Sequence, residues 1–288
     1  MAPLKSRFRA TLVSFKDVIT KRPHLTVPFI ILAFLDYAAL TLIYLAPRDP
    51  LSKIMAPPIR KIWGEQYLHY PHNFSLIPKL FNYGHIFISF TFGLILSAVF
   101  IKLISFHFDP EKNIHQRPFM SSIAIAFKKY IPMVIFFGVF YLLTQMLFKI
   151  TGMAVPLFVE SGSLVSIISL CLNFIGSFLL QTLFVFMFPI LIISDQGLIR
   201  TFIDNFKLVF SHYRPVFFLI ALPSLLYLIV MLNMIFLPRL VQRFEPEIVL
   251  VSLGINIFLT VIIDFFITGF SAILYCHIVK TKGNNHEA

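Results

Sequence analysis

Two carboxylates are the side chains best placed to do chemistry, because each lies near the middle of a long apolar run. Asp36 stands in FLDYAAL and Asp264 in VIIDFFI. A charge at the bilayer centre costs about 3 kcal/mol on insertion scales, and such residues often mark ion or substrate pathways. A protonated carboxyl that donates a hydrogen bond between helices is the alternative, at about 0.6 kcal/mol per contact. We favour this structural role, since no intramembrane Lys or Arg is available as a partner.

A second group of ionisable residues comprises Glu65, His69 and His72 before the second apolar run and His85 at the start of that run. A carboxylate and imidazoles are ligands that zinc accepts. Pro71 interrupts the spacing, however, and no standard zinc pattern is met. We interpret these histidines as interfacial residues beside Trp63 and Tyr70 and expect no metal site.

Recognisable catalytic motifs are missing from the sequence. It has no Gly-rich phosphate loop, no serine nucleophile elbow and no paired-cysteine motif. Its two cysteines, Cys171 and Cys276, lie within apolar runs and are typical of small buried side chains. We therefore expect a protein that is not an enzyme and has no cofactor.

Composition excludes an ordinary soluble domain. Hydrophobic residues make up 58% of the 288 residues and charged residues 13%, whereas a soluble domain is nearer half apolar and a quarter charged. The formal net charge is +11, which suits a membrane protein beside anionic cytoplasmic lipids. The basic residues occur as scattered pairs rather than as one face, so we expect no nucleic-acid partner.

The apolar runs predict an all-α protein with six membrane spans, since about twenty apolar residues cross a bilayer. The whole chain, 1–288, is then one integral membrane domain. Residues 47–83 are rich in proline and predict a loop with a segment at the opposite interface. The predicted spans are 25–46, 84–106, 131–149, 164–190, 215–237 and 249–278.

Three short amphipathic segments, 10–22, 120–130 and 197–211, each precede an odd-numbered span. Each carries a Phe-Lys pair and is followed by a proline: Phe15-Lys16 and Pro23, Phe127-Lys128 and Pro132, Phe206-Lys207 and Pro215. One apolar and one charged face suit a helix in the plane of the membrane interface; an ordinary loop helix packed on its neighbours is the alternative. The side chains expected to contact anionic headgroups are Lys16, Lys128, Lys207 and Arg214.

The even-numbered spans share polar or small residues at every fourth position, which places them near one helical face. Together with the amphipathic segments, this pattern predicts three parallel repeats, each an interfacial helix followed by two spans. Besides the two carboxylates, the polar candidates within the spans are Asn173, Gln181, Asn256 and Thr260.

The stretch FPILIISDQGLIRTFIDNFKLVFSHYRPV carries a resemblance to a known family. Its proline, apolar run, short polar turn, amphipathic helix and basic end resemble six-span bacterial inner-membrane proteins of unknown function. These are related to the membrane domain found beside glycerophosphodiester phosphodiesterases. The resemblance would cover residues of about 10–280. In that family the catalytic domain is separate and soluble, so it implies no phosphodiesterase activity here.

The distribution of Lys and Arg favours both termini in the cytoplasm, although the first outer loop is more basic than the positive-inside rule prefers. We expect a multi-pass inner (plasma) membrane protein whose partners are lipids, with a role in organising or supporting the membrane. The alternative is a small transporter or channel-like protein with a polar path past Asp36 and Asp264. A path requires the polar residues to face a wet cavity, whereas helix adhesion requires them to pair in dry contacts.

Overall fold

The computed structural model describes residues 4–108, 118–158, 162–194, 196–243 and 247–284, which are mostly helical and contain no strand. In these ranges six helices are long and apolar enough to cross a membrane. The predicted all-α, multi-pass membrane protein is thereby confirmed. The six helices are Pro23–Tyr44, His72–Phe108, Tyr130–Leu157, Leu164–Ile193, Tyr213–Asn233 and Ile248–Lys280.

Residues 47–83, predicted as a loop, are mostly helical. Helix α3 runs from Ser52 to Trp63, a 3-10 turn η2 covers Glu65–Leu68, and α4 runs from His72 to Ile88. The second spanning helix thus begins at His72 rather than at residue 84. The prolines that suggested a loop lie inside helices, Pro57 and Pro58 in α3 and Pro78 in α4. Packing overrides their low helix propensity, because Ile59 is buried in a cluster with Ala46 and Leu76.

The contacts within the chain define two compact units, each of which is described by itself. Unit 1 comprises residues 1–28, 94–228 and 263–288, and unit 2 comprises residues 29–93 and 229–262. The division falls within the helices α2 (Val27–Tyr44), α11 (Tyr213–Arg243) and α12 (Ile248–Asn284). Several long helices therefore contribute one end to each unit.

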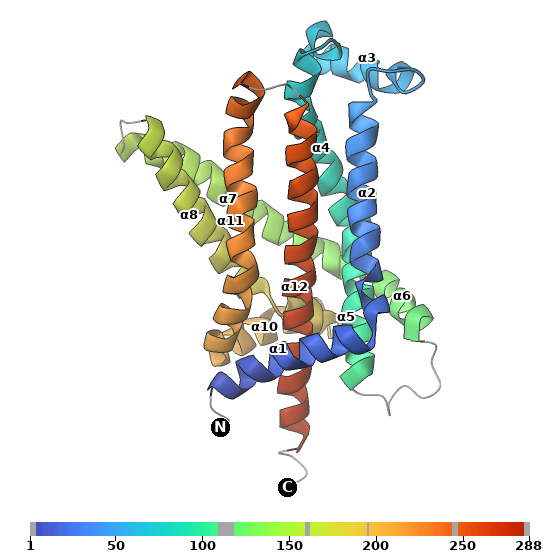
Figure 1. Cartoon of the computed structure of the whole chain (residues 1–288). Coiled ribbons are helices and arrows are strands. Elements are labelled where there is room, and N and C mark those ends of the chain that lie inside the picture. The colour runs from blue at the N-terminus through green and yellow to red at the C-terminus, as the bar shows by residue number, and fades with distance from the viewer. Residues whose placement is uncertain (1–3, 109–117, 159–161, 195, 244–246, 285–288) are drawn as a thin grey trace. The chain divides into compact units, whose positions relative to one another are not determined.

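Unit 2 has its core where α2, α4 and the first turns of α12 meet. The apolar side chains buried there are Leu40, Ile43, Phe74, Ile77, Phe81, Val249, Leu253 and Ile257. Helix α3 lies across the ends of α2 and α4 (Figure 1) and is held there by the cluster of Ala46, Ile59 and Leu76. A π-helical segment, η3 (Ser89–Gly93), follows α4.

Unit 1 contains the helices expected to lie in the membrane plane: α1 (Leu4–Lys21), α6 (Pro118–Lys128) and α10 (Leu198–Ser211). Each packs on an even-numbered span. Phe15 of α1 contacts Phe265, Phe266 and Phe270 of α12, and Figure 1 shows α1 crossing that part of α12. Helix α6 packs along α5 (Leu94–Phe108), and α10 packs on α8 (Gly162–Phe184) and α9 (Met187–Ile193). Helix α7 (Tyr130–Phe158) pairs with α8.

Span four is broken between α8 and α9, and Asn205 of α10 bridges the break. Pro189 in the first turn of α9 has no N–H to bond the carbonyl of Val185, which removes one helical hydrogen bond at the break. The fully buried Asn205 side chain donates from Nδ2 to the Leu183 carbonyl at 2.6 Å and accepts from the Phe186 N–H at 3.0 Å. Both freed backbone groups thus find partners, as burial away from water requires.

Candidate functional site

Asp36 and His85 form an ionisable pair between two spanning helices of unit 2. Asp36, on α2, is 1% exposed, and its Oδ1 lies 3.0 Å from Nδ1 of His85 on α4. Phe81, one turn before His85, stacks against the imidazole with ring centroids 6.0 Å apart. A carboxylate in such surroundings needs a partner, and the imidazole provides either an N–H donor or a protonated counter-charge.

The backbone changes from α-helix to π-helix one turn after His85. The π-helical segment η3 (Ser89–Gly93) begins there, and the N–H of Ser89 bonds the carbonyls of both His85 and Ile86. Wider turns of this kind appear mostly as single-turn insertions and often lie at functional sites. The pair therefore combines two features that mark functional positions in spanning helices, an ionisable contact and a π segment.

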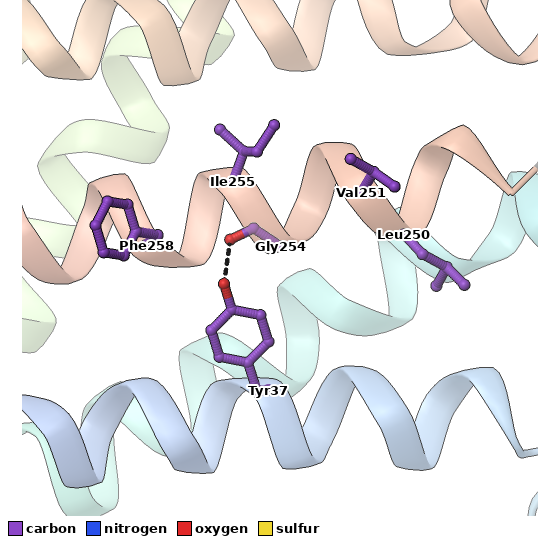
Figure 2. Close-up of a pocket in the computed structure, with 6 residues that line it drawn as sticks. All are labelled: Tyr37, Leu250, Val251, Gly254, Ile255 and Phe258. Carbon is purple, nitrogen blue, oxygen red and sulfur yellow. Dashed lines mark hydrogen bonds between the residues drawn. The ribbon is translucent and has the colours of Figure 1, made fainter.

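A shallow groove of about 540 Å³ lies in unit 2 and is lined by Tyr37 of α2 and by apolar residues of α12. Figure 2 shows Tyr37 of α2 reaching this helix, where its hydroxyl donates to the carbonyl of Gly254 at 2.7 Å. A Cβ at Gly254 would lie 3.5 Å from Cε1 of the Tyr37 ring, which is an ordinary van der Waals contact. The other lining residues are Leu250, Val251, Ile255 and Phe258.

An amide cluster joins α11 to α12 in unit 2. Asn233 donates from Nδ2 to Oδ1 of Asn256 at 2.8 Å and to the carbonyl of Ser252 at 3.1 Å. The hydroxyl of Ser252 donates back to Oδ1 of Asn233 at 2.7 Å. Nδ2 of Asn256 is buried with no hydrogen-bond partner among the described residues. Thr260, one turn further along α12, is half-buried.

The polar candidates of unit 1 pair in the same manner. The hydroxyl of Thr151 on α7 donates to Oδ1 of Asn173 on α8. The hydroxyl of Ser224 on α11 donates to Oε1 of Gln181 at 3.2 Å, and Ser224 is 3% exposed. Asp264 is half-buried and lies within electrostatic range of Tyr227.

Sequence reasoning identified one member of most of these pairs and missed the other. Asp36 belongs to unit 2 and Asp264 to unit 1, so each has its own surroundings and a joint site remains a prediction. Several partners lie on the odd-numbered spans, outside the four-residue polar spacing of the even-numbered spans: Thr151, Ser224 and Asn233. His85 was visible as a polar residue of span two, but only tertiary structure sets it against Asp36.

The four predicted headgroup contacts, Lys16, Lys128, Lys207 and Arg214, all have exposed side chains. Arg214 also donates from Nε to the hydroxyl of Tyr213 at 2.7 Å. On α10 the face toward the protein carries Thr201 and Asn205, both fully buried. The opposite face carries large exposed apolar side chains, with Ile199 80% and Phe210 67% exposed.

One histidine of the first loop, His69, lies near an ion pair. Arg60 donates to Glu65 from two nitrogens, Nη2 at 3.0 Å, and this contact lowers the pKa of the Glu65 carboxyl. Nε2 of His69 lies 3.9 Å from the same carboxylate. Among the described residues no group of three or more His, Cys, Asp or Glu side chains is arranged to hold a metal ion.

Comparison of the chain with known protein-family models, curated proteins and solved structures gave no match. The family resemblance of the stretch from Phe188 to Val216 stays a prediction.

Proposed function

We propose that this chain is a non-enzymatic integral protein of the inner (plasma) membrane that organises or supports the surrounding bilayer, with both termini in the cytoplasm. The direct pairing of intramembrane polar side chains between helices carries this proposal. A solute path needs such groups to face water, whereas helix adhesion needs them to face each other. The pairs are Asp36 with His85, Thr151 with Asn173, Gln181 with Ser224, and Asn233 with Ser252 and Asn256.

The faces of α10 support a position in the membrane plane. Ile199, Ile203 and Phe210 are 80%, 60% and 67% exposed and fall on one side of the helix. Moving each such side chain from water into lipid is favourable by about 2 kcal/mol. Lys207, exposed on a third side, is then available to anionic headgroups.

The packing of the three short helices supports the threefold repeat. Each has a fully buried hydroxyl residue followed four residues later by a second buried residue: Thr11 and Phe15, Ser122 and Ala126, Thr201 and Asn205. The second and third short helices each pack on the even-numbered span just before them in the chain, α6 on α5 and α10 on α8. The first short helix, α1, packs on the last even-numbered span, α12. A common packing rule of this kind is what three copies of one unit would produce.

Reconstitution tests the supporting role. Purified protein is incorporated into vesicles of phosphatidylglycerol and phosphatidylethanolamine, and lipid order and vesicle diameter are measured as the protein-to-lipid ratio rises. We expect both quantities to change with the wild type and to change much less with Ile199→Ser/Ile203→Ser/Phe210→Ser. Asp204→Asn, on the charged side of the same helix, is the control. If the wild type leaves both quantities unchanged, the proposed role is wrong.

The Asp36–His85 pair favours one second candidate, a small proton-coupled transporter. Ionisable residues inside a membrane recur in proton relays, and here the pair adjoins a π segment. In the same vesicles a pH gradient would then drive proton flux, measured with an entrapped pH dye. Asp36→Asn would abolish that flux and leave the folded protein intact. Equal, background-level flux in wild type and Asp36→Asn would exclude this candidate.

A further inference from the structure

The basic residues of the first loop, at odds with the positive-inside rule, are gathered around α3. Lys53 and Lys61 of α3 and Lys79 of α4 are all exposed. The two acidic residues nearby already have partners in the structure. Glu65 accepts from Arg60, and Asp49 accepts from the hydroxyl of Ser52 at 2.9 Å. The hydroxyl of Ser52 leaves the charge of Asp49 in place, but five basic side chains stand against these two carboxylates, so the surface around α3 has an excess of positive charge: Arg48, Lys53, Arg60, Lys61 and Lys79.

Helix α3 has three distinct sides. One side faces the cluster of Ala46 and Leu76 and is formed, at four-residue spacing, by Met55, Ile59 and Trp63. A second side carries Ile54, Pro58 and Ile62 at the same spacing, and the two isoleucines are 74% and 63% exposed. Lys53 and Lys61 lie on the remaining side of α3. A helix with an exposed apolar row beside a basic row is typical of one that lies in a membrane interface.

The packing of α3 fixes its depth relative to the spanning helices. Ile59, which is 4% exposed, packs with Ala46 just beyond the end of α2 and with Leu76 in the second turn of α4. Helix α3 thus lies where these two helices leave the apolar layer, crossing their ends (Figure 1). Aromatic side chains typical of that depth surround it, with cations over their faces. Arg48 lies 5.2 Å from the ring centroid of Tyr44, and Lys79 lies 5.9 Å from that of Trp63.

We propose that the surface of α3 formed by Ile54, Ile62, Lys53, Lys61 and Lys79 binds anionic phospholipids of the leaflet at that end of α2 and α4. The isoleucines enter the acyl-chain boundary, and the ammonium groups pair with headgroup phosphates. Positive charge beside an apolar row matches an anionic amphiphile, whereas an acidic soluble partner would meet two exposed isoleucines with no apolar counterpart. This assignment is independent of the supporting role proposed above. It also explains why the first loop is rich in basic residues, against the positive-inside rule.

The chain contains its own probe, because Trp63 on α3 is its single tryptophan. The full protein is reconstituted into phosphatidylcholine vesicles containing an equal mole fraction of brominated phosphatidylglycerol or brominated phosphatidylcholine. Bromine quenches indole fluorescence on contact, so the ratio of the two quenching strengths measures anionic-lipid enrichment beside Trp63. One lysine in the headgroup layer favours an anionic lipid by about fivefold. We therefore expect markedly stronger quenching by the anionic lipid at low salt, which weakens as salt is raised.

Two sets of variants localise the effect. Lys53→Gln/Lys61→Gln/Lys79→Gln should bring the quenching ratio to one, while Lys16→Gln/Lys128→Gln/Lys207→Gln, matched in charge, should leave it unchanged. Ile54→Ser/Ile62→Ser should reduce quenching by both lipids and increase quenching by aqueous acrylamide. A wild-type ratio of one, or a ratio that survives the first triple variant, overturns the proposal. So does strong acrylamide quenching with no bromine quenching, which would assign the surface to a soluble partner.

Discussion

Asp36 and His85 face each other between α2 and α4 with their nearest polar atoms 3.0 Å apart, and the carboxylate is almost completely buried. Removing one partner of a buried charge pair commonly costs 3–5 kcal/mol, whereas a neutral hydrogen bond inside a membrane averages about 0.6 kcal/mol. Because these two costs differ several-fold, the stability lost on substituting Asp36 distinguishes a charge pair from a neutral hydrogen bond.

We expect Asp36→Leu to destabilise the protein by about 3 kcal/mol, because the imidazole of His85 loses its carboxylate partner on α2. Asp36→Asn keeps a polar contact and should cost about 1 kcal/mol. Unfolding in mixed detergent micelles, followed by circular dichroism, measures both losses. Thr41→Val is the control on α2, since the Thr41 hydroxyl donates to the Tyr37 carbonyl of its own helix and should matter little. If Asp36→Leu is as stable as wild type, the pair has no structural role.

The span count was predictable from the sequence because the bilayer imposes a single strong requirement, about twenty apolar residues in a row. The helix α3 was not, because its prolines oppose helix formation and only the burial of Ile59 compensates. The polar residues of the even spans were recognisable by period. Their partners, such as Asn233 and Ser224, follow no period that a single chain reveals.

The Phe-Lys pairs show a second limit of pattern reading. Phe15 is 7% exposed and packs on α12, whereas Phe127, in the same dipeptide on α6, is 62% exposed. The two dipeptides therefore lie on different helical faces. The position of Phe15 on α1 is taken by Ala126 on α6 and by Asn205 on α10, which are small or polar buried residues that hydropathy does not distinguish.

Asn205 should be among the most sensitive positions of α10. Asn205→Leu removes the partners of the Leu183 carbonyl and the Phe186 N–H, and each unsatisfied buried group costs about 1–3 kcal/mol. We expect a total loss of about 3 kcal/mol in detergent unfolding. Asp204→Asn, a neighbour only partly buried, should change stability by under about 0.5 kcal/mol. Equal stability of Asn205→Leu and Asp204→Asn would contradict the bridging role.

The pH dependence of the first loop follows from the Arg60–Glu65 contact. Arg60 lowers the pKa of Glu65, so the stabilisation by this pair is present above the ordinary glutamate range and is lost as pH falls through the lowered pKa. We expect Arg60→Gln to move the carboxyl titration of Glu65 upward, toward its ordinary value. Carbon-13 NMR of labelled glutamate side chains measures the shift. Because both groups are exposed, the effect on global stability should be small, and Lys61→Gln should leave the titration nearly unchanged. A Glu65 titration that is the same in Arg60→Gln and wild type would show that the contact does not persist in solution.

Gly269 determines how closely α1 approaches α12. A Cβ at this position would overlap the ring of Phe15, which is buried among Phe265, Phe266 and Phe270. Overpacking of this kind costs about 1–3 kcal/mol, so we expect Gly269→Ala to lower stability by that amount. Phe15→Leu removes the obstructing ring, and the double variant Gly269→Ala/Phe15→Leu should lose less than the sum of the two single losses. Gly152→Ala is the matched control, because nothing lies within 4 Å of the added Cβ and alanine favours the helix. Detergent unfolding of the four variants measures the coupling, and strictly additive losses would mean that Phe15 does not rest on Gly269.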